Sequence, residues 1–428
     1  MLPLRFIREN ADLVRAGLSA RGDDAPLDGL LELDRKRRAL LVDVEGWRAE
    51  RKRVSRAIGT ASDASEREAL IAQTRALSKD LDASEPKLGQ IESDLDRLLG
   101  EFPALPHASA PAGQDANDNP VVAEHGTPPA FDFEPRPHWE IGETLGVLDF
   151  PRAAKIAGSG FWLFRAGGAR LQRALVAWAI DFQVREHGYL EVLPPALVTS
   201  RGMADSGKLP KFADDSYGLP ADDLWLNPTA EVPLTAMHRD EVLDGGTLPL
   251  RYVAYTPAFR REAGAAGIDT RGLQRLHQFD KVELYAFSLA EQSYEELETM
   301  RRHAEAAIEA LGLPYRTLEL CTGDLGFTSA KTYDLEAWAP GVNAWLEVSS
   351  ISNCEAFQAR RAGIRTRKPG GSHTEFVHTL NGSGLGMART MVAILENYQQ
   401  ADGTVRVPEV LQPYLGGQKV LEVEPGWQ

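Results

Sequence analysis

The stretch Phe259–Glu283, FRREAGAAGIDTRGLQRLHQFDKVE, carries the strongest signal in the chain. It opens with Phe-Arg-Arg-Glu, continues through a segment rich in glycine and alanine, and closes in the strand-like run FDKVELYAF. Two strands joined by a mobile, arginine-bearing loop form a clamp for a nucleoside triphosphate, because a guanidinium can form paired hydrogen bonds with phosphate. The stretch therefore predicts a pair of strands that hold a nucleotide.

Three side chains of this stretch have the chemistry that a nucleotide requires. Arg260 can bind a phosphate, Glu262 can accept a hydrogen bond from an exocyclic amine, and Phe279 can offer its flat face to a purine. An Arg-x-Glu pattern alone is more often a surface ion pair, so the prediction rests on the whole stretch.

Length and composition set outer limits. The chain has 428 residues, of which 43% are hydrophobic, which is enough for a large core and two or three domains. No run of 18 apolar residues predicts a membrane span, and Arg5, Arg8 and Glu9 interrupt any signal-peptide pattern. Cys321 and Cys354 stand far apart without a CxxC pattern, which favours buried thiols in a reducing cytosol and no zinc site.

Residues 28–100 predict an antiparallel coiled-coil hairpin. Leu33, Leu40, Trp47 and Val54 recur every seven residues in the first helix. In the second helix, Leu70, Leu77, Ile91 and Leu98 form one stripe, and Leu81, Leu88 and Leu95 form the other. The run RAIGTASDASE, residues 56–66, breaks the pattern and predicts the tip of the hairpin.

The two helices of this hairpin carry opposite charge. Residues 31–60 hold nine Lys/Arg and five Asp/Glu, whereas residues 61–100 hold five and nine. The opposite charges could pair across the hairpin and be otherwise solvated. Alternatively, the first helix could present a stripe that contacts phosphates. The candidate phosphate-binding residues are Arg35, Arg38, Arg48, Arg51, Lys52 and Arg56.

The rest of the chain predicts a linker followed by an α+β domain. Residues 101–135 are rich in proline, interspersed with Gly, Asn and Asp, and predict a loop-like connection. Beyond them, an amphipathic helix over 171–187 ends at Gly188, and many strand-like runs follow with few βαβ alternations. This order favours a mostly antiparallel sheet flanked by helices.

Three further segments hold candidate ligand-binding groups. In Asn227–Glu231, Thr229 and Glu231 could bind a small cation, although a Thr that begins a helix is the commoner use of such a pair. Glu347 and Ser350 alternate with apolar residues at a strand end and could bind Mg²⁺, or could simply be ordinary strand residues. The run HTLNGSGLGMARTM predicts a glycine-rich turn leading into a helix over 384–398, from which Arg389 could reach a terminal phosphate.

The full set of motifs resembles the seryl-tRNA synthetases, a family of class II aminoacyl-tRNA synthetases. Pro195 in GYLEVLPPALV matches motif 1, PAFRREAG…HQFDKVE matches motif 2, and GSGLGMARTMVAILENYQ matches motif 3. KLPKF, NPTAEVPLT and SSISNCEAFQARR are further wording typical of this family, so the resemblance covers nearly the whole chain.

The resemblance implies a role for each candidate residue. Thr229 and Glu231 would hold the amino group of serine, while Glu283, Asn381 and Ser383 would read its side chain or close the pocket. Arg260 would bridge the serine carboxylate and the α-phosphate of ATP, Glu262 would read adenine and Phe279 would stack on it. Glu347 and Ser350 would bind Mg²⁺, and Arg389 would hold the γ-phosphate.

The resemblance also implies the organisation and partners of the protein. Residues 1–110 would form the helical arm with its linker, and 111–428 the catalytic domain of a cytoplasmic homodimer. Its substrates would be ATP, L-serine and tRNA(Ser), with tRNA(Sec) as a further possibility. Two alternatives remain open at this point: a relative that loads an amino acid onto a carrier protein, and an inactive tRNA-binding scaffold.

Overall fold

The computed structural model describes residues 1–263 and 271–423 of the chain. Residues 264–270 of the loop predicted to be mobile, between the two strands of the Phe259–Glu283 stretch, lie outside the described residues. Two compact units are present: one comprises residues 2–19 and 23–103, and the other comprises residues 1, 20–22 and 104–428. No helix in the described part of the chain is long and apolar enough to cross a membrane.

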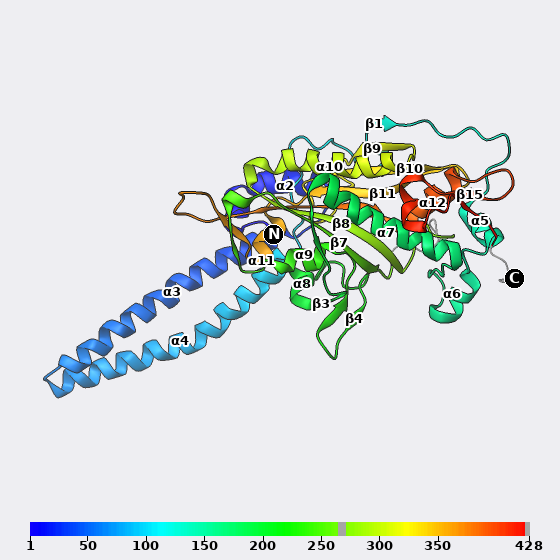
Figure 1. The fold of residues 1–428 in the computed structure, drawn as a ribbon. Helices are drawn as coiled ribbons and strands as arrows, with labels where there is room; N and C mark the ends of the chain where they lie inside the picture. The colour runs from blue at the N-terminus through cyan, green and yellow to red at the C-terminus, as the bar shows by residue number, and fades with distance from the viewer. Residues whose placement is uncertain (264–270, 424–428) are drawn as a thin grey trace. The chain divides into compact units, whose positions relative to one another are not determined.

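The smaller unit is built on a helical hairpin, as the heptad pattern predicts. Helices α1 (Leu4–Glu9) and α2 (Ala11–Ala20) precede the long helices α3 (Leu27–Thr60) and α4 (Ala64–Leu99) (Figure 1). Leu81, Leu88 and Leu95 are buried in the seam, where Leu81 and Leu88 pack with Val44. The other predicted stripe of α4 is less buried, because its residues Leu70, Leu77, Ile91 and Leu98 are only half-buried.

The tip of the hairpin is shorter than the sequence predicts. Residues 56–60 belong to α3, so that only residues 61–63 connect the two helices. Asp63 begins α4 because its side chain accepts a hydrogen bond from the backbone N–H of Glu66 at 2.9 Å. With this cap, three residues are sufficient to connect the two helices, and residues 56–60 remain helical.

The larger unit is organised by one eight-stranded sheet. Its strand order is β1 (Val121–His125), β9 (Tyr315–Glu319), β10 (Lys331–Ala339), β11 (Ala344–Asn353), β14 (His378–Gly386), β8 (Gln278–Ser288), β7 (Leu250–Phe259) and β2 (Leu190–Val192). All neighbours pair antiparallel except β2 and β7. The predicted α+β class with a mostly antiparallel sheet is confirmed.

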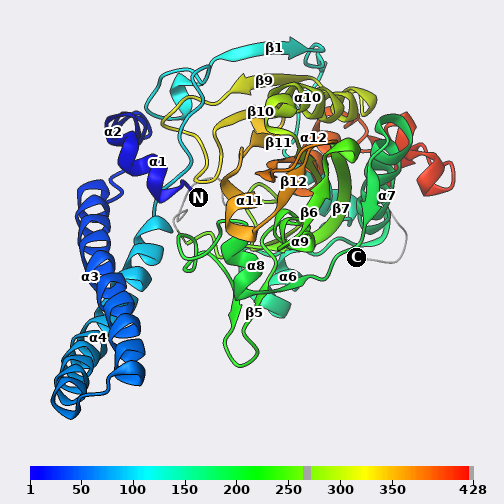
Figure 2. The same ribbon diagram turned by 90° about the vertical axis from the view of Figure 1, so that its left-hand side faces the viewer.

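Helices cover both faces of this sheet (Figures 1 and 2). The main core lies between the sheet and a group of longer helices, and it contains Leu171, Leu284 and Leu297. These helices are α5 (His138–Leu145), α7 (Ala166–His187), α10 (Ser293–Ala310) and α12 (Met387–Asn397). A second core, containing Leu234, Tyr285 and Ala359, lies on the opposite face beneath α9 (Glu231–Met237) and α11 (Phe357–Ala362).

Shorter elements complete the unit. The short helices are α6 (Phe150–Ala157) and α8 (Ser200–Asp205). The small sheets are formed by β3 (Leu197–Thr199), β5 (Leu224–Leu226) and β4 (Gly218–Leu219), by β13 (Glu375–Phe376), β12 (Arg365–Arg367) and β6 (Val242–Asp244), and by β15 (Val405–Arg406) and β16 (Val420–Leu421). The 3₁₀ turns within the described residues are Ala116–Asp118, Gly245–Thr247, Ala290–Gln292, Glu409–Leu411 and Pro413–Leu415.

Two sequence-based predictions about this unit are wrong. The predicted linker contains β1, an exposed strand that is recognisable only through its pairing with β9. The glycine-rich run before α12 forms strand β14 rather than a turn, and the helix begins at Met387. Its glycines give room to neighbouring strands, since a Cβ at Gly382 would lie 3.1 Å from the Ile351 side chain.

A histidine pair between α7 and α10 makes the stability of the fold sensitive to pH. The rings of His187 and His303 stack with centroids 4.0 Å apart. Burial, the neighbouring His187 and Arg251 lower the pKa of His303 to about 3. The unfolded chain binds this proton near pH 6.5, so stability is lost as the pH falls from about 6.5 towards about 3.

We expect His303→Gln to reduce this acid sensitivity. Thermal unfolding of the unmodified chain and the variant, compared at pH 7.5 and pH 5, should show a smaller loss of Tm for the variant. Because His303 is only half-buried, solvent weakens the effect to a few degrees at most. An equal loss of Tm in both proteins would contradict the prediction.

Candidate active site

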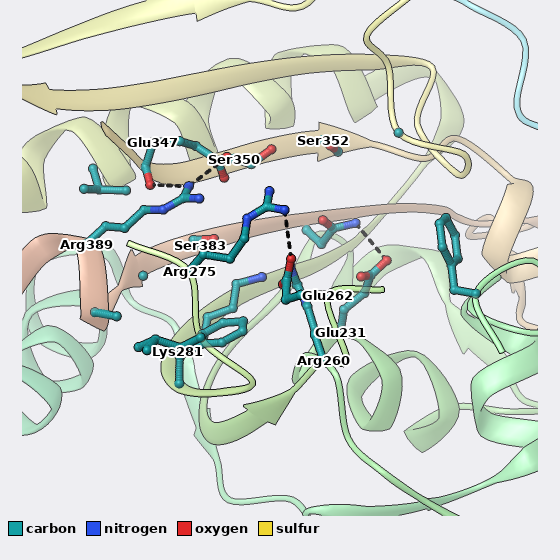
Figure 3. Close-up of a pocket in the computed structure, with 18 of the residues that line it drawn as sticks. Glu231, Arg260, Glu262, Arg275, Lys281, Glu347, Ser350, Ser352, Ser383 and Arg389 are labelled. Atoms are coloured by element: carbon teal, nitrogen blue, oxygen red, sulfur yellow. Dashed lines mark hydrogen bonds and ion pairs between the residues drawn. The ribbon is translucent and has the colours of Figure 1, made fainter. Parts of the chain in front are cut away.

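A cavity of about 440 Å³ opens on the sheet face opposite the main core (Figure 3). Strands β8, β11 and β14 form its floor, and the first turn of α12 and residues 273–276 border it. Most of the residues predicted from sequence line it, namely Glu231, Arg260, Glu262, Phe279, Glu347, Ser350, Asn381, Ser383 and Arg389. The other two, Thr229 and Glu283, are buried beside it.

Strand register explains how these residues meet. Phe279, Lys281 and Glu283 alternate along β8 and therefore share one face, while Val282 and Leu284 lie in the main core, as the strand periodicity predicts. Glu283 lies directly opposite Ser383 on β14. Residues from distant motifs thus share one surface.

A β-bulge places Glu347 beside Ser350. Residues three apart in a regular strand face opposite sides. Here Leu335 of β10 pairs with Ser349, and Glu336 pairs with Glu347, which leaves Val348 as an extra residue. Glu347 therefore faces the same cavity as Ser350, and their side chains lie together in Figure 3.

Glu231 is the centre of a buried polar cluster at one end of the cavity. Its carboxylate contacts Lys208 Nζ at 2.8 Å and accepts hydrogen bonds from Gln358 at 2.5 Å and Asn381 at 3.4 Å. Burial by itself would raise the pKa of Glu231, but the Lys208 ammonium, the charge of Lys281 and the hydrogen bond from Gln358 bring the pKa below its ordinary value. The cluster holds a carboxylate that is ionised and ready to bind a cation.

Glu231 is also the first residue of α9. The Thr229 hydroxyl accepts a long hydrogen bond from the Glu231 backbone N–H, at 3.4 Å. The N-cap residue of α9 is Ala230, however, so the alternative in which Thr229 caps the helix is one residue out of register. The same hydroxyl donates to Glu283 Oε2 at 3.2 Å. Thr229 therefore links the start of α9 to β8.

Glu283 is fully buried and only partly satisfied. Lys281 Nζ lies 2.5 Å from its Oε2, while its Oε1 has no hydrogen-bond partner among the described residues. Burial raises the pKa of Glu283, Lys281 opposes the rise, and the nearby Glu231 adds to it. A ligand hydroxyl that reached Oε1 would remove an unpaired buried acceptor.

Arg260, Glu262 and Phe279 form the second half of the cavity. The Arg260 guanidinium lies over the Phe279 ring, 5.1 Å from its centroid, and its Nε donates to the Pro228 carbonyl at 3.3 Å. Glu262 pairs with Arg275 at 3.2 Å. The Phe259–Glu283 stretch thus brings a cation, a carboxylate and an aromatic ring together.

Arg389 closes the far end of the cavity. It lies in the first turn of α12, as predicted, and its Nη1 contacts Glu347 Oε2 at 3.2 Å. Its Nε donates to the Gln274 carbonyl at 3.1 Å. Arg389 consequently bridges the bulged strand β11 and the segment that leads into β8.

Four polar residues that the sequence analysis did not assign belong to the site: Lys208, Arg275, Lys281 and Gln358. Lys208 and Lys281 lie within the quoted KLPKF and FDKVE motifs, and the position of Lys281 between Asp280 and Glu283 was an available signal. Gln358 gives no local signal, because only the packing of α11 brings it to Glu231.

The arm candidates fall into two groups. Arg35 and Arg38 pair with Glu32 and Asp34 within α3, and Arg48 reaches Glu85 of α4 at 2.8 Å. Of these three residues, only Arg48 follows the alternative of charge pairing across the hairpin, because Arg35 and Arg38 pair within their own helix. Arg51, Lys52 and Arg56 are exposed, line one shallow surface hollow with Arg48, and form no ion pair that we find within the described part of the chain. They form the free part of the basic stripe.

Comparison with known proteins identifies the class of this fold and site. Residues 216–398 match the class II tRNA synthetase core domain that serves glycine, histidine, proline, serine and threonine. Residues 1–106 match the seryl-tRNA synthetase N-terminal domain. The chain belongs to the seryl-tRNA synthetase family.

Individual relatives agree over nearly the whole length. The chain is 54% identical to a serine–tRNA ligase of Roseiflexus sp., with 98% of this chain and 99% of the relative covered. A serine–tRNA ligase of Thermomicrobium roseum is 52% identical over all of this chain and 96% of the relative. The crystal structure of the Pyrococcus horikoshii seryl-tRNA synthetase complexed with ATP matches with a TM-score of 0.93 at 38% identity, covering 99% of this chain and 100% of that one.

Proposed function

We propose that this protein joins L-serine to tRNA(Ser) in two steps at the described cavity. In the first step, the serine carboxylate attacks the α-phosphorus of ATP, and pyrophosphate leaves. In the second step, a hydroxyl of the 3′-terminal ribose attacks the carbonyl carbon of seryl-adenylate, and AMP leaves. The observation that carries the proposal is that one cavity joins an acidic cluster, suited to an amino acid, to an Arg–Phe–Glu set, suited to ATP.

The serine half of the site is formed by the acidic cluster. Glu231 and Thr229 would hold the ammonium group, with Asn381 and Ser383 at the side-chain end. The unpartnered Oε1 of Glu283 would accept the serine hydroxyl. Alanine would leave this acceptor unpaired, which explains how the site would reject it.

The ATP half of the site would work by positioning and charge neutralisation. Arg260 would bridge the serine carboxylate and the α-phosphate, Phe279 would stack on adenine, Glu262 would read its exocyclic amine, and Arg389 would hold the γ-phosphate. In this scheme no side chain becomes covalently linked to substrate. The acceleration comes from orientation and from cationic groups held where charge develops.

Glu347 and Ser350 would hold Mg²⁺. They supply a half-exposed carboxylate and a hydroxyl on one cavity face, and no cluster of three or more His, Cys, Asp or Glu suited to a metal occurs in the described residues. Two hard oxygen donors without a full protein cage fit Mg²⁺, which keeps waters and binds substrate phosphates. When bound, the ion would supply positive charge to the phosphates of ATP.

Glu347→Gln should raise the Mg²⁺ requirement of the reaction. The amide keeps the shape of the side chain but loses the negative charge, so we expect the Mg²⁺ concentration for half-maximal serine-dependent pyrophosphate exchange to rise about tenfold or more, which is about 1.4 kcal/mol. A titration with MgCl₂ at saturating ATP measures it. Glu336→Gln, the same change on the neighbouring strand and outside the cavity lining, is the matched control. Equal Mg²⁺ requirements for both variants would contradict the assignment.

The arm, residues 28–100 within a proposed domain of residues 1–110, would bind tRNA through phosphate contacts of its basic stripe. The free cations Arg51, Lys52 and Arg56 would contribute most, with Arg35, Arg38 and Arg48 able to exchange their carboxylate partners for phosphates. Residues 111–428 would form the catalytic domain.

The active form would be a cytoplasmic homodimer. Pro195 matches the motif 1 proline, and Leu190 and Leu193 beside it are 62% and 81% exposed. Apolar side chains so exposed at the edge strand β2 are suited to contact a second copy of the chain. Sedimentation measurements on the unmodified chain test this assembly.

The decisive test is transfer of labelled serine to total bacterial tRNA with ATP and Mg²⁺. Robust charging would support both steps. No charging, together with transfer of serine to a carrier-protein thiol, would replace the proposal with the carrier-loading alternative. Failure of serine-dependent pyrophosphate exchange would replace it with the inactive scaffold.

A further inference from the structure

Behind the ATP half of the cavity lies a buried histidine–carboxylate hydrogen bond that the proposed mechanism does not use. His138, the first residue of α5, and Glu396, near the end of α12, are both fully buried. His138 Nδ1 lies 2.8 Å from Glu396 Oε1, and the backbone N–H of His138 donates to the same oxygen at 2.9 Å. Glu396 Oε2 accepts from the N–H groups of Gly341 and Val342 at 2.8 and 3.1 Å. Four donors thus hold this carboxylate.

The other ring nitrogen of His138 contacts the segment that borders the cavity. The backbone N–H of Leu273 donates to His138 Nε2 at 2.9 Å. Because a backbone N–H can only donate, Nε2 carries no proton, and Nδ1 donates to Glu396. Glu396 thereby selects the tautomer that accepts from Leu273.

The residue before Leu273 is shaped for this approach. Gly272 has φ +72°, and a Cβ there would lie 2.1 Å from His138 Nε2. Any side chain at position 272 would therefore displace the imidazole. One residue earlier, the Arg271 guanidinium lies over the Trp139 ring, 4.4 Å from its centroid. Two neighbouring side chains in the first turn of α5, His138 and Trp139, thus contact residues 271–273.

The residues that follow this segment contact groups proposed to bind ATP. The Gln274 carbonyl, next to Leu273, accepts from Arg389 Nε at 3.1 Å, and Arg275 pairs with Glu262 at 3.2 Å. Displacement of the Leu273 peptide would move Arg389 and Glu262 together. The serine cluster around Glu231 and Glu283 makes its contacts through residues outside this segment, namely Lys208, Thr229, Lys281, Gln358 and Asn381.

We propose that His138, oriented by Glu396, is a positioning residue for ATP: it holds residues 271–275 so that Arg389 and Glu262 face the nucleotide. The inference rests on the proposed function, because it requires that ATP binds in this cavity. It predicts that loss of the Nε2 acceptor weakens the binding of ATP selectively and leaves the binding of serine unchanged.

Two substitutions of His138 distinguish the roles of its two ring nitrogens. His138→Asn keeps a donor near the Nδ1 position and loses the Nε2 acceptor, whereas His138→Gln places an amide oxygen near the Nε2 position. In serine-dependent pyrophosphate exchange with MgATP, we expect His138→Asn to raise the KM for ATP about tenfold with the KM for serine unchanged. His138→Gln should recover most of that loss.

A surface variant covers the case in which His138→Asn does not fold. Arg271 is exposed, so Arg271→Ala leaves the core intact while it removes the contact with Trp139. It should raise the KM for ATP roughly threefold and leave that for serine unchanged. Equal rises in both KM values, no rescue by His138→Gln, or an unchanged KM for ATP in Arg271→Ala would each overturn the inference. Absence of exchange by the unmodified chain would instead overturn the proposed function.

Discussion

Arg260→Ala should abolish adenylate formation, lowering the rate of serine-dependent pyrophosphate exchange about a thousandfold, or about 4 kcal/mol of transition-state stabilisation. The physical reason is the position of the guanidinium: it lies over Phe279, which we propose to stack on adenine, and it lines the same cavity as Glu231 of the acidic cluster. There it would neutralise both the serine carboxylate and the α-phosphate, two anions that must approach each other. Single-turnover measurement of seryl-adenylate gives the same quantity without interference from tRNA.

The neighbouring arginine supplies a matched control. The Arg261 guanidinium lies 4.7 Å from the centroid of Tyr217, its Nε donates to the Ser216 carbonyl at 2.9 Å, and it does not line the cavity. We therefore expect Arg260→Lys to lose most activity, because an ammonium cannot bind two anions with the geometry of a guanidinium. Arg261→Lys should stay within about threefold of the unmodified chain. Near-normal exchange by Arg260→Ala would refute the role assigned to it.

Removal of residues 28–100 should spare serine activation and reduce tRNA charging about a thousandfold. These residues belong to the smaller compact unit, whereas every residue that lines the cavity belongs to the larger one. Pyrophosphate exchange depends on the cavity alone, but charging also requires the phosphate contacts of the arm. Parallel assays of exchange and charging on the same preparation distinguish the two effects.

A charge-neutralised arm makes the test sharper, because it keeps the hairpin. The triple variant Arg51→Gln, Lys52→Gln and Arg56→Gln neutralises three exposed cations of α3. We expect this variant to bind tRNA more weakly and with a smaller dependence on salt. The slope of the logarithm of the binding constant against the logarithm of the salt concentration should become shallower by about one unit for each lost phosphate contact. The matched control, Arg67→Gln, Arg75→Gln and Lys79→Gln, removes three exposed cations of α4. Equal effects of the two triple variants would show that only the total charge of the arm matters. For the deletion of residues 28–100, unchanged tRNA charging would show that the arm has only a structural role.

Local sequence patterns predicted those elements whose signals lie within a few residues. The leucine stripes predicted α3 and α4, the alternation in FDKVELYAF predicted β8, and Gly188 predicted the end of α7, where it adopts φ +69° as a C-cap. The same reading failed for β1 and β14. An exposed edge strand and a glycine-containing central strand lack the apolar alternation of an isolated strand, and only pairing with distant strands defines them.

By itself, the sequence determined which chemical groups are available and on which elements they lie, including Phe279 and Glu283 on one strand, Arg260 directly after the preceding strand, and the cations of α3. Only the tertiary structure decided how those groups combine. The extra residue Val348 turns Glu347 towards Ser350, and Lys208 and Gln358 contact Glu231. His138 accepts a hydrogen bond from the backbone N–H of Leu273. The physical reason is that strand register and helix packing are set by contacts between residues far apart in the chain, and no local periodicity encodes those contacts.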